Sequence, residues 1–142
     1  MMPKIKKMWQ INYYMVITAY TDGASLGNPG RMGIGVVLYQ SGKKIGEISE
    51  YIGEGTNNVA EYTAVIRAIE FAKLQGDNTV HIMSDSELVV KQLTGKYKIK
   101  DEKLKLLHQQ VLNYSIGMKM SYEHIPREKN SYADKLAKLG AE

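Results

Sequence analysis

The pattern of apolar and polar positions divides the first third of the chain into short β-type runs. Residues 15–21 are rich in Val, Ile and Tyr, which predicts a first, central strand. Two further runs of this kind occupy residues 33–40 and 44–52, and the Ser41-Gly42 pair between them is typical of a tight turn. The beginning of the chain therefore predicts three antiparallel strands in a meander.

Helical spacing begins after the third run. Between residues 56 and 75 the apolar residues recur every three or four positions, which predicts a long helix. These residues are Tyr62, Val65, Ile66, Ile69 and Ala72. A short apolar strand at 79–84 follows, and because a helical crossover leads to it, we expect it to lie parallel to an earlier strand.

The remaining patterns complete an α/β domain. We expect, in chain order, helices at 86–93 and 101–114, a strand at 118–125 and a helix at 131–139. The resulting order βββαβααβα predicts a mixed five-stranded sheet with helices packed on its faces.

Composition fits one domain and limits the kinds of site that it can carry. With 142 residues, 44% of them hydrophobic, the chain can bury a substantial core. We expect the domain at 15–142, after a basic extension at 1–14. No apolar run is long enough to span a membrane and the N-terminus lacks a secretion signal, so we expect a cytoplasmic protein without membrane association. Because the chain has no cysteine, a metal ion would need oxygen or imidazole ligands.

Charge is unevenly distributed along the chain. Residues 1–90 carry 8 Lys or Arg against 9 Asp or Glu, whereas residues 91–142 carry 11 against 6. The basic second part could attract a phosphate backbone. A solvated lysine-rich surface explains the same bias, so charge alone leaves nucleic-acid binding open.

Four acidic residues lie at the ends of predicted elements, and each has a structural explanation. Asp22 follows the first strand in an Asp-Gly turn pair. Glu61 could form a capping box with Asn58, and Asp85 could cap the helix that begins at residue 86. Asp134 could pair with a lysine one turn further along its helix, Lys138.

Taken together, the four acids predict a metal site. Asp22 and Asp85 follow strands that should be adjacent and parallel, and the carboxyl ends of such strands are where α/β sheets bind ligands. The starts of two helices can bring Glu61 and Asp134 to the same edge. Clustered carboxylates repel one another unless a cation neutralises them, and oxygen ligands alone favour Mg²⁺ or Mn²⁺.

Four blocks of the sequence strongly resemble type 1 ribonuclease H, in the same order and over nearly the whole chain from residue 15. They are YTDGASLGNPGRMGIG, TNNVAEYTAVIRAIEFA, SDSELVV and HIPREKNSYADKLA. The resemblance implies the ribonuclease H fold and an active site made of Asp22, Glu61, Asp85 and Asp134. It also implies endonucleolytic cleavage of the RNA strand of RNA–DNA hybrids, leaving 5′-phosphate and 3′-hydroxyl ends. Two Mg²⁺ ions, with Mn²⁺ as an alternative, would assist this in-line displacement.

The resemblance also implies a set of substrate contacts. Small residues and amides at the family's groove-lining positions would approach the 2′-hydroxyls that distinguish RNA from DNA. These positions are Gly23, Ala24, Ser25, Asn28, Asn57 and Asn58. Thr56 resembles a residue that holds a DNA phosphate. Glu87 stands where relatives often have a neutral residue, and we place it with the substrate-contacting group.

Two segments depart from the family pattern. The basic handle of longer relatives is reduced to residues 95–100, which contain three lysines. The flexible Gly-His loop before the last acid is replaced by His124-Ile125-Pro126-Arg127-Glu128. We favour Arg127 over His124 as the loop residue that reaches the scissile phosphate, because a guanidinium group matches phosphate geometry.

These departures leave two alternative functions open. One is a non-catalytic nucleic-acid-binding module of the same fold, and the other is a related nuclease that acts on double-stranded RNA or on DNA. For the main hypothesis we expect a monomer whose macromolecular partner is the RNA–DNA hybrid.

Overall fold

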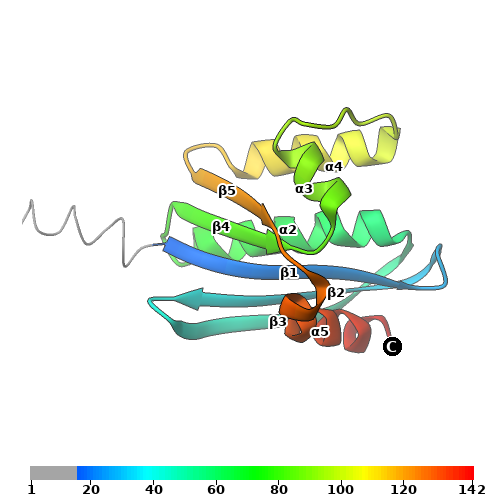
Figure 1. The fold of residues 1–142 in the computed structure, drawn as a ribbon, viewed down its shortest axis with the longest axis horizontal. Helices are drawn as coiled ribbons and strands as arrows, with labels where there is room; N and C mark the ends of the chain where they lie inside the picture. Colours follow the sequence, from blue (N-terminus) through cyan, green and yellow to red (C-terminus); the bar gives the residue numbers. More distant parts are fainter. Residues whose placement is uncertain (1–15) are drawn as a thin grey trace, which may run out of the picture.

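The computed structural model describes residues 16–142, and they form one mixed five-stranded sheet with helices on both faces (Figure 1). The strands are β1 (Val16–Leu26), β2 (Gly30–Gln40), β3 (Lys43–Gly55), β4 (Thr79–Ser84) and β5 (Lys119–His124). The helices are α2 (Asn57–Leu74), α3 (Glu87–Leu93), α4 (Glu102–Tyr114) and α5 (Ser131–Ala141), with a 3-10 helix η1 (Arg127–Asn130) before α5. The predicted extension at 1–14 and its boundary with the domain lie outside the described residues.

Strand order and direction follow the predicted topology. The order across the sheet is β3-β2-β1-β4-β5. The first three strands pair antiparallel, whereas β4 pairs parallel to both β1 and β5. The tight turn after β2 contains Ser41 and Gly42, both with positive φ. The predicted antiparallel meander and the predicted parallel placement of β4 are therefore confirmed.

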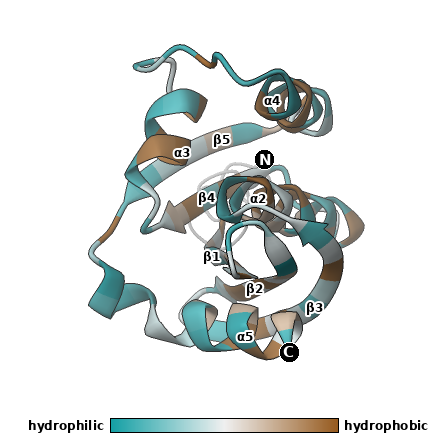
Figure 2. Ribbon diagram, turned by 90° about the vertical axis from the view of Figure 1, so that its right-hand side faces the viewer, coloured by the Kyte–Doolittle hydropathy of each residue, from teal (hydrophilic) through white to brown (hydrophobic). Residues whose placement is uncertain are grey.

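Helices α2 and α5 lie on opposite faces of the sheet, and α4 packs against α2 (Figure 2). All five apolar residues that predicted the long helix are buried in α2. The alanines of α2 at 60, 64 and 68 are also fully buried, and their small side chains allow the helix backbone to lie close to its neighbours. The main hydrophobic core therefore lies between the sheet, α2 and α4.

The first strand is longer than its sequence pattern predicts. Its expected end was residue 21, but β1 continues to Leu26 and stays paired with β2 as far as Arg31. Pairing with β4 stops at Thr21, which lies opposite Ser84. Asp22 thus lies within β1, at the point where the parallel neighbour ends, and the proposed Asp-Gly turn there is wrong.

One glycine in β1 and one in β2 allow helices to pack closely on the two faces of the sheet. A Cβ atom on Gly23 would lie 2.2 Å from the Ala60 carbonyl carbon of α2. On the other face, a Cβ on Gly35 would lie 2.1 Å from the Ala133 carbonyl oxygen of α5. The missing side chains of Gly23 and Gly35 therefore let two helices approach the sheet closely.

Within residues 16–142, no helix is both long and apolar enough to cross a membrane.

Replacing Gly35 by alanine should destabilise the domain, because the new methyl group would collide with the α5 backbone and force the helix outward. We expect a loss of about 1–3 kcal/mol in the free energy of unfolding, measured by urea denaturation. Gly46→Ala is the matched control, because the nearest atom to its Cβ is the ring tip of Phe71, which can move. An equal loss in both variants would contradict this account.

Candidate active site

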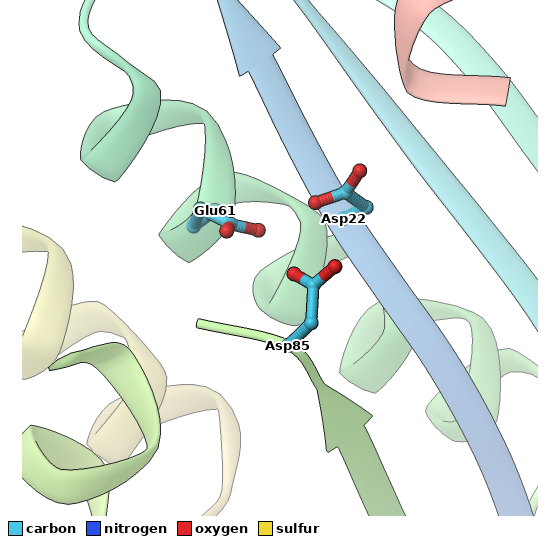
Figure 3. A group of neighbouring side chains, drawn as sticks. All are labelled: Asp22, Glu61 and Asp85. Carbon is cyan, nitrogen blue, oxygen red and sulfur yellow. The ribbon is translucent and has the colours of Figure 1, made fainter. Parts of the chain in front are cut away.

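Three carboxylates from separate elements converge at one edge of the sheet. Asp22 comes from β1, Glu61 from α2, and Asp85 from the residue after β4. Each offers an oxygen atom that lies within 4.8 Å of the other two. Figure 3 shows the three side chains pointing toward one another from these elements. The structure thus brings together three of the four predicted acids as one cluster.

Glu61 is held against β1 by a backbone hydrogen bond. The Gly23 N–H donates to Glu61 Oε1 at 2.8 Å, over the position where the missing Cβ lets α2 approach. The capping box proposed for Glu61 and Asn58 does not form. Thr56 is the N-cap, and its hydroxyl accepts a hydrogen bond from the Val59 N–H. Glu61 is therefore available for the cluster instead of the helix terminus.

Asp85 is likewise released from helix capping. The Ser86 hydroxyl caps α3 by accepting from the Val89 N–H, and the Ser84 hydroxyl accepts from the Ser86 N–H. The proposal that Asp85 caps this helix is therefore wrong. Its carboxylate points toward that of Asp22 (Figure 3). The two acids directly follow Thr21 and Ser84, the last residues that β1 and β4 pair with each other.

Asp134 joins the site from the first turn of α5. It lines the same cleft as the three clustered acids, whose volume is about 450 Å³. The Lys138 ammonium lies 3.1 Å from Asp134 Oδ2, so the predicted ion pair is confirmed. Asp134 thus lies beside the cluster, where its side chain is hydrogen-bonded to Asp22 and paired with Lys138.

Burial and mutual repulsion raise the pKa values of the clustered acids. Asp22 is only 5% exposed, and burial, followed by the charges of Asp85 and Asp134, raises its pKa to about 8. Burial and the charges of Asp22 and Asp85 raise the pKa of Glu61 well above its ordinary value. Burial also raises the pKa of Asp85, although the Arg127 charge opposes this shift. The three groups are not all ionised at neutral pH unless a cation compensates them.

The donor set fits a hard divalent cation. All three ligating groups are carboxylates, they come from rigid elements, and their repulsion would be relieved by positive charge between them. Asp134 lies in the same cleft and could complete the ligand set. The four acids are therefore suited to hold Mg²⁺ or Mn²⁺.

The two loop candidates lie in different places. Arg127, the first residue of η1, lines the cleft and acts electrostatically on Asp85. His124 is the exposed last residue of β5, opposite Ser84, and does not line the cleft. Of the two, the structure brings only Arg127 to the acids.

Several predicted substrate residues form a network beside the acids. Gly23, Ala24, Ser25 and Asn57 line the cleft. The Ser25 N–H donates to Asn57 Oδ1 at 2.7 Å, and the Asn57 N–H donates to Asn28 Oδ1 at 2.9 Å. The turn after β1 is thereby attached to the start of α2.

Asn28 and three further predicted residues lie outside the cleft lining. Thr56 is engaged as the N-cap of α2, and Asn58 lies in its first turn. Glu87 is exposed, with its carboxylate 3.7 Å from the Lys91 ammonium on α3.

The sequence patterns missed Asn130 as part of the site. It occupies the N-cap position of α5 but makes no capping bond, because its side-chain amide donates to the Thr21 carbonyl at 2.9 Å. A hydrogen bond from Asn130 to Asp85 also lowers the pKa of that acid. An asparagine just before a helix predicts a cap, so only the tertiary contact reveals this role.

The metal-free protein should lose stability as the pH rises. Since the pKa of Asp22 is about 8 in the folded state against an ordinary 3.8, the folded state keeps a proton that the unfolded state releases. In EDTA, we expect the free energy of unfolding to decrease as the pH rises from 3.8 to about 8. This group contributes a decrease of at most about 1.4 kcal/mol per pH unit. Urea titrations across this range would measure it.

In this experiment Asp22→Asn should weaken the dependence of the free energy of unfolding on pH, because an amide does not titrate. Asp101→Asn is the control, since Asp101 caps α4 and does not line the cleft, and asparagine caps equally well. A slope that is unchanged in Asp22→Asn would contradict the raised pKa of Asp22.

Comparisons with known proteins agree with this arrangement. A family described as “Reverse transcriptase-like” matches residues 20–140. The ribonuclease H of Actinobacillus pleuropneumoniae is 32% identical over 142 residues, covering 89% of this chain and 90% of that protein. A bifunctional protein of Mycobacterium tuberculosis is 38% identical over 126 residues, and the chain spans only 35% of its length.

Solved structures lead to the same family. The crystal structure of LC11-RNase H1 in complex with an RNA/DNA hybrid matches with a TM-score of 0.84 at 43% identity, covering 88% of this chain and 96% of that one. The predicted ribonuclease H fold is thereby confirmed. By sequence and by fold, this chain belongs to the ribonuclease H family.

Proposed function

We propose that this chain is a metal-dependent endoribonuclease that cleaves the RNA strand of RNA–DNA hybrids and leaves 5′-phosphate and 3′-hydroxyl ends. The observation that carries the proposal is the buried cluster of Asp22, Glu61 and Asp85, whose oxygen atoms lie within 4.8 Å of one another. Repulsion between the buried carboxylates destabilises the folded protein, and a bound divalent cation would relieve this repulsion. Membership of the ribonuclease H family supports the hybrid as substrate.

Four acids would hold the metal ions: Asp22, Glu61, Asp85 and Asp134. Two Mg²⁺ ions bound there would ionise a water and stabilise the attacking and leaving oxygens of the phosphodiester. The protein's own contribution is to fix the carboxylates before substrate arrives, through the hydrogen bond from Gly23 to Glu61 and the Asn130 amide. The salt bridge with Lys138 keeps Asp134 oriented at the edge of the cleft.

The neighbouring network would hold the RNA strand. Asn57 accepts a hydrogen bond from the Ser25 N–H, which fixes its side chain and leaves its amide N–H groups as donors for a ribose or base. Asn28 is fixed in turn by the Asn57 N–H. Thr56 lies at the N-terminus of α2, where backbone N–H groups favour a DNA phosphate. Gly23 and Ala24 would allow close approach of the strand, with Asn58 and Glu87 at the periphery.

Arg127 would contact the scissile phosphate. It lines the cleft beside Asp85, and its guanidinium group can donate two parallel hydrogen bonds to phosphate oxygens. His124, the last residue of β5, does not line the cleft. A monomeric enzyme in the cytoplasm remains our expectation for its assembly and location.

Loss of one clustered carboxylate should abolish cleavage of a labelled RNA–DNA hybrid in Mg²⁺. Because the removal of residues that merely support metal ligands costs about 10–100-fold, Asp22→Asn and Asp85→Asn should each lose at least about 100-fold. Asp101→Asn should keep wild-type turnover, and EDTA should abolish activity in the unaltered chain. Full activity in Asp22→Asn would exclude the proposed chemistry.

A substrate panel in the same assay separates the alternatives. Cleavage of double-stranded RNA or DNA in preference to the hybrid would identify a related nuclease, and tight hybrid binding without cleavage would identify a binding module.

Arg127→Ala should lower turnover more than His124→Ala does. A lost hydrogen bond between charged groups costs about 1.5–3 kcal/mol, which corresponds to about 10- to 100-fold in rate. Arg127→Lys should restore only part of the loss, because an ammonium group cannot form the paired hydrogen bonds. A larger effect at His124 would transfer the role to that residue.

A further inference from the structure

Two basic side chains line the catalytic cleft together with the four acids. Arg127 comes from η1 and Lys138 from α5. Among residues 16–142, Lys138 is the one of the two that forms an ion pair with an acid of the cleft, with its ammonium 3.1 Å from Asp134 Oδ2. The chain therefore places a cation of its own on the fourth predicted metal ligand.

The geometry of α5 brings this lysine to the carboxylate. Positions 134 and 138 lie one turn apart, and helical side chains lean toward the N-terminus of their helix, so the Lys138 stem points back toward Asp134. The lysine side chain is 53% exposed, whereas that of Asp134 is only 23% exposed. Because its stem is flexible, the ammonium can leave the carboxylate for solvent without any movement of the backbone.

Asp134 is compensated in a way that the other three acids are not. No lysine, arginine or histidine of the described chain forms an ion pair with Asp22, Glu61 or Asp85. These three acids supply the oxygen atoms of the compact cluster, and Asp134 is not a member of that group. A metal ion that enters the cluster meets carboxylates without a paired cation, whereas one that binds Asp134 must share it with an ammonium group.

We propose that Lys138 competes with a metal ion for Asp134 and so weakens the binding of the ion that this acid would help to hold. The inference rests on the proposed function, because it takes the four acids as metal ligands. An ammonium and a divalent ion on one carboxylate repel each other, so metal binding at Asp134 must displace the lysine. The three clustered acids should then fill first, and the site that includes Asp134 should fill at a higher metal concentration.

An ordinary ion pair on a helix surface is the simpler explanation. Asp and Lys four residues apart stabilise many helices slightly, and such a pair has no specific effect on metal binding. The position of this pair favours competition instead, because both residues line the cleft and the Asp134 side chain is also hydrogen-bonded to Asp22. Removal of the lysine therefore changes the charge directly beside the clustered acids.

Binding of Mn²⁺ to the full chain and its variants, without nucleic acid, tests the proposal. Electron paramagnetic resonance of the unbound ion gives the number of bound ions and their affinities. Lys138→Met removes the ammonium and keeps an apolar stem. It should tighten the weaker site about 10-fold, the order expected for a unit charge close to a divalent ion in water. Lys138→Arg keeps the charge, so it should retain the weak affinity.

Lys135→Met is the matched control, because it removes the same charge from the same helix at an exposed position that does not line the cleft. It should change the affinity by less than about 2-fold, since salt screens exposed charges that are not in contact. In an Asp134→Asn background, Lys138→Met should have no larger effect than Lys135→Met, because the carboxylate for which the lysine competes is gone.

Three results would overturn the proposal. The first is a Lys138→Met variant that binds Mn²⁺ no better than Lys135→Met does. The second is weaker binding in Lys138→Met, which would mean that the lysine only orients Asp134. The third is an equal gain from Lys138→Met with and without the Asp134 carboxylate. Unaltered protein whose Mn²⁺ binding is absent, or is unchanged by Asp22→Asn, would overturn the metal-dependent function as well.

Discussion

The close approach of α2 to β1 at Gly23 is the contact on which the active site depends. With no side chain at this position, the helix backbone can lie where a Cβ would otherwise meet Ala60 and Glu61. The same glycine donates its N–H to the Glu61 carboxylate, so one residue sets both the distance of the helix and the orientation of its acid. A larger residue at position 23 would push α2, and with it Glu61, away from Asp22, even with all four acids unchanged.

The cluster shows a conflict between stability and function. Burial and repulsion raise the pKa values of Asp22, Glu61 and Asp85, so the folded protein bears an electrostatic cost that the unfolded chain does not. The sheet, α2 and their core hold the carboxylates in place despite this cost. That strain favours cation binding, because a bound cation relieves it.

The second glycine contact, between β2 and α5, gives the sheet its asymmetry. Helix α5 approaches closely at Gly33 and Gly35, which brings Asp134 to the catalytic edge. The start of β1 and the end of β2 instead form the floor of a separate groove of about 700 Å³. The short helix η1 connects both regions, with Arg127 facing the cleft and Lys129 facing the groove.

The sequence by itself determined the order of elements, the apolar face of α2 and the identity of the four acids. These are local or periodic properties, since side-chain spacing follows helix and strand geometry and carboxylates at element ends are visible in the chain. Only the tertiary structure decided how far β1 extends, because its last residues are held by pairing with β2. It also decided that Thr56 and Ser86 cap their helices while Glu61 and Asp85 face the cluster.

The same limit explains the glycines and Asn130. From the sequence, a glycine beside an acid is consistent with a turn, with space for a substrate or with close packing of a helix, and only the structure shows that α2 packs on Gly23. From the sequence, Asn130 is expected to cap α5. In the structure its side-chain amide instead donates a hydrogen bond to the Thr21 carbonyl, 109 residues away in the chain. Contacts between residues so distant in sequence leave no periodic signal, so local patterns determine which groups are present and packing determines what each one touches.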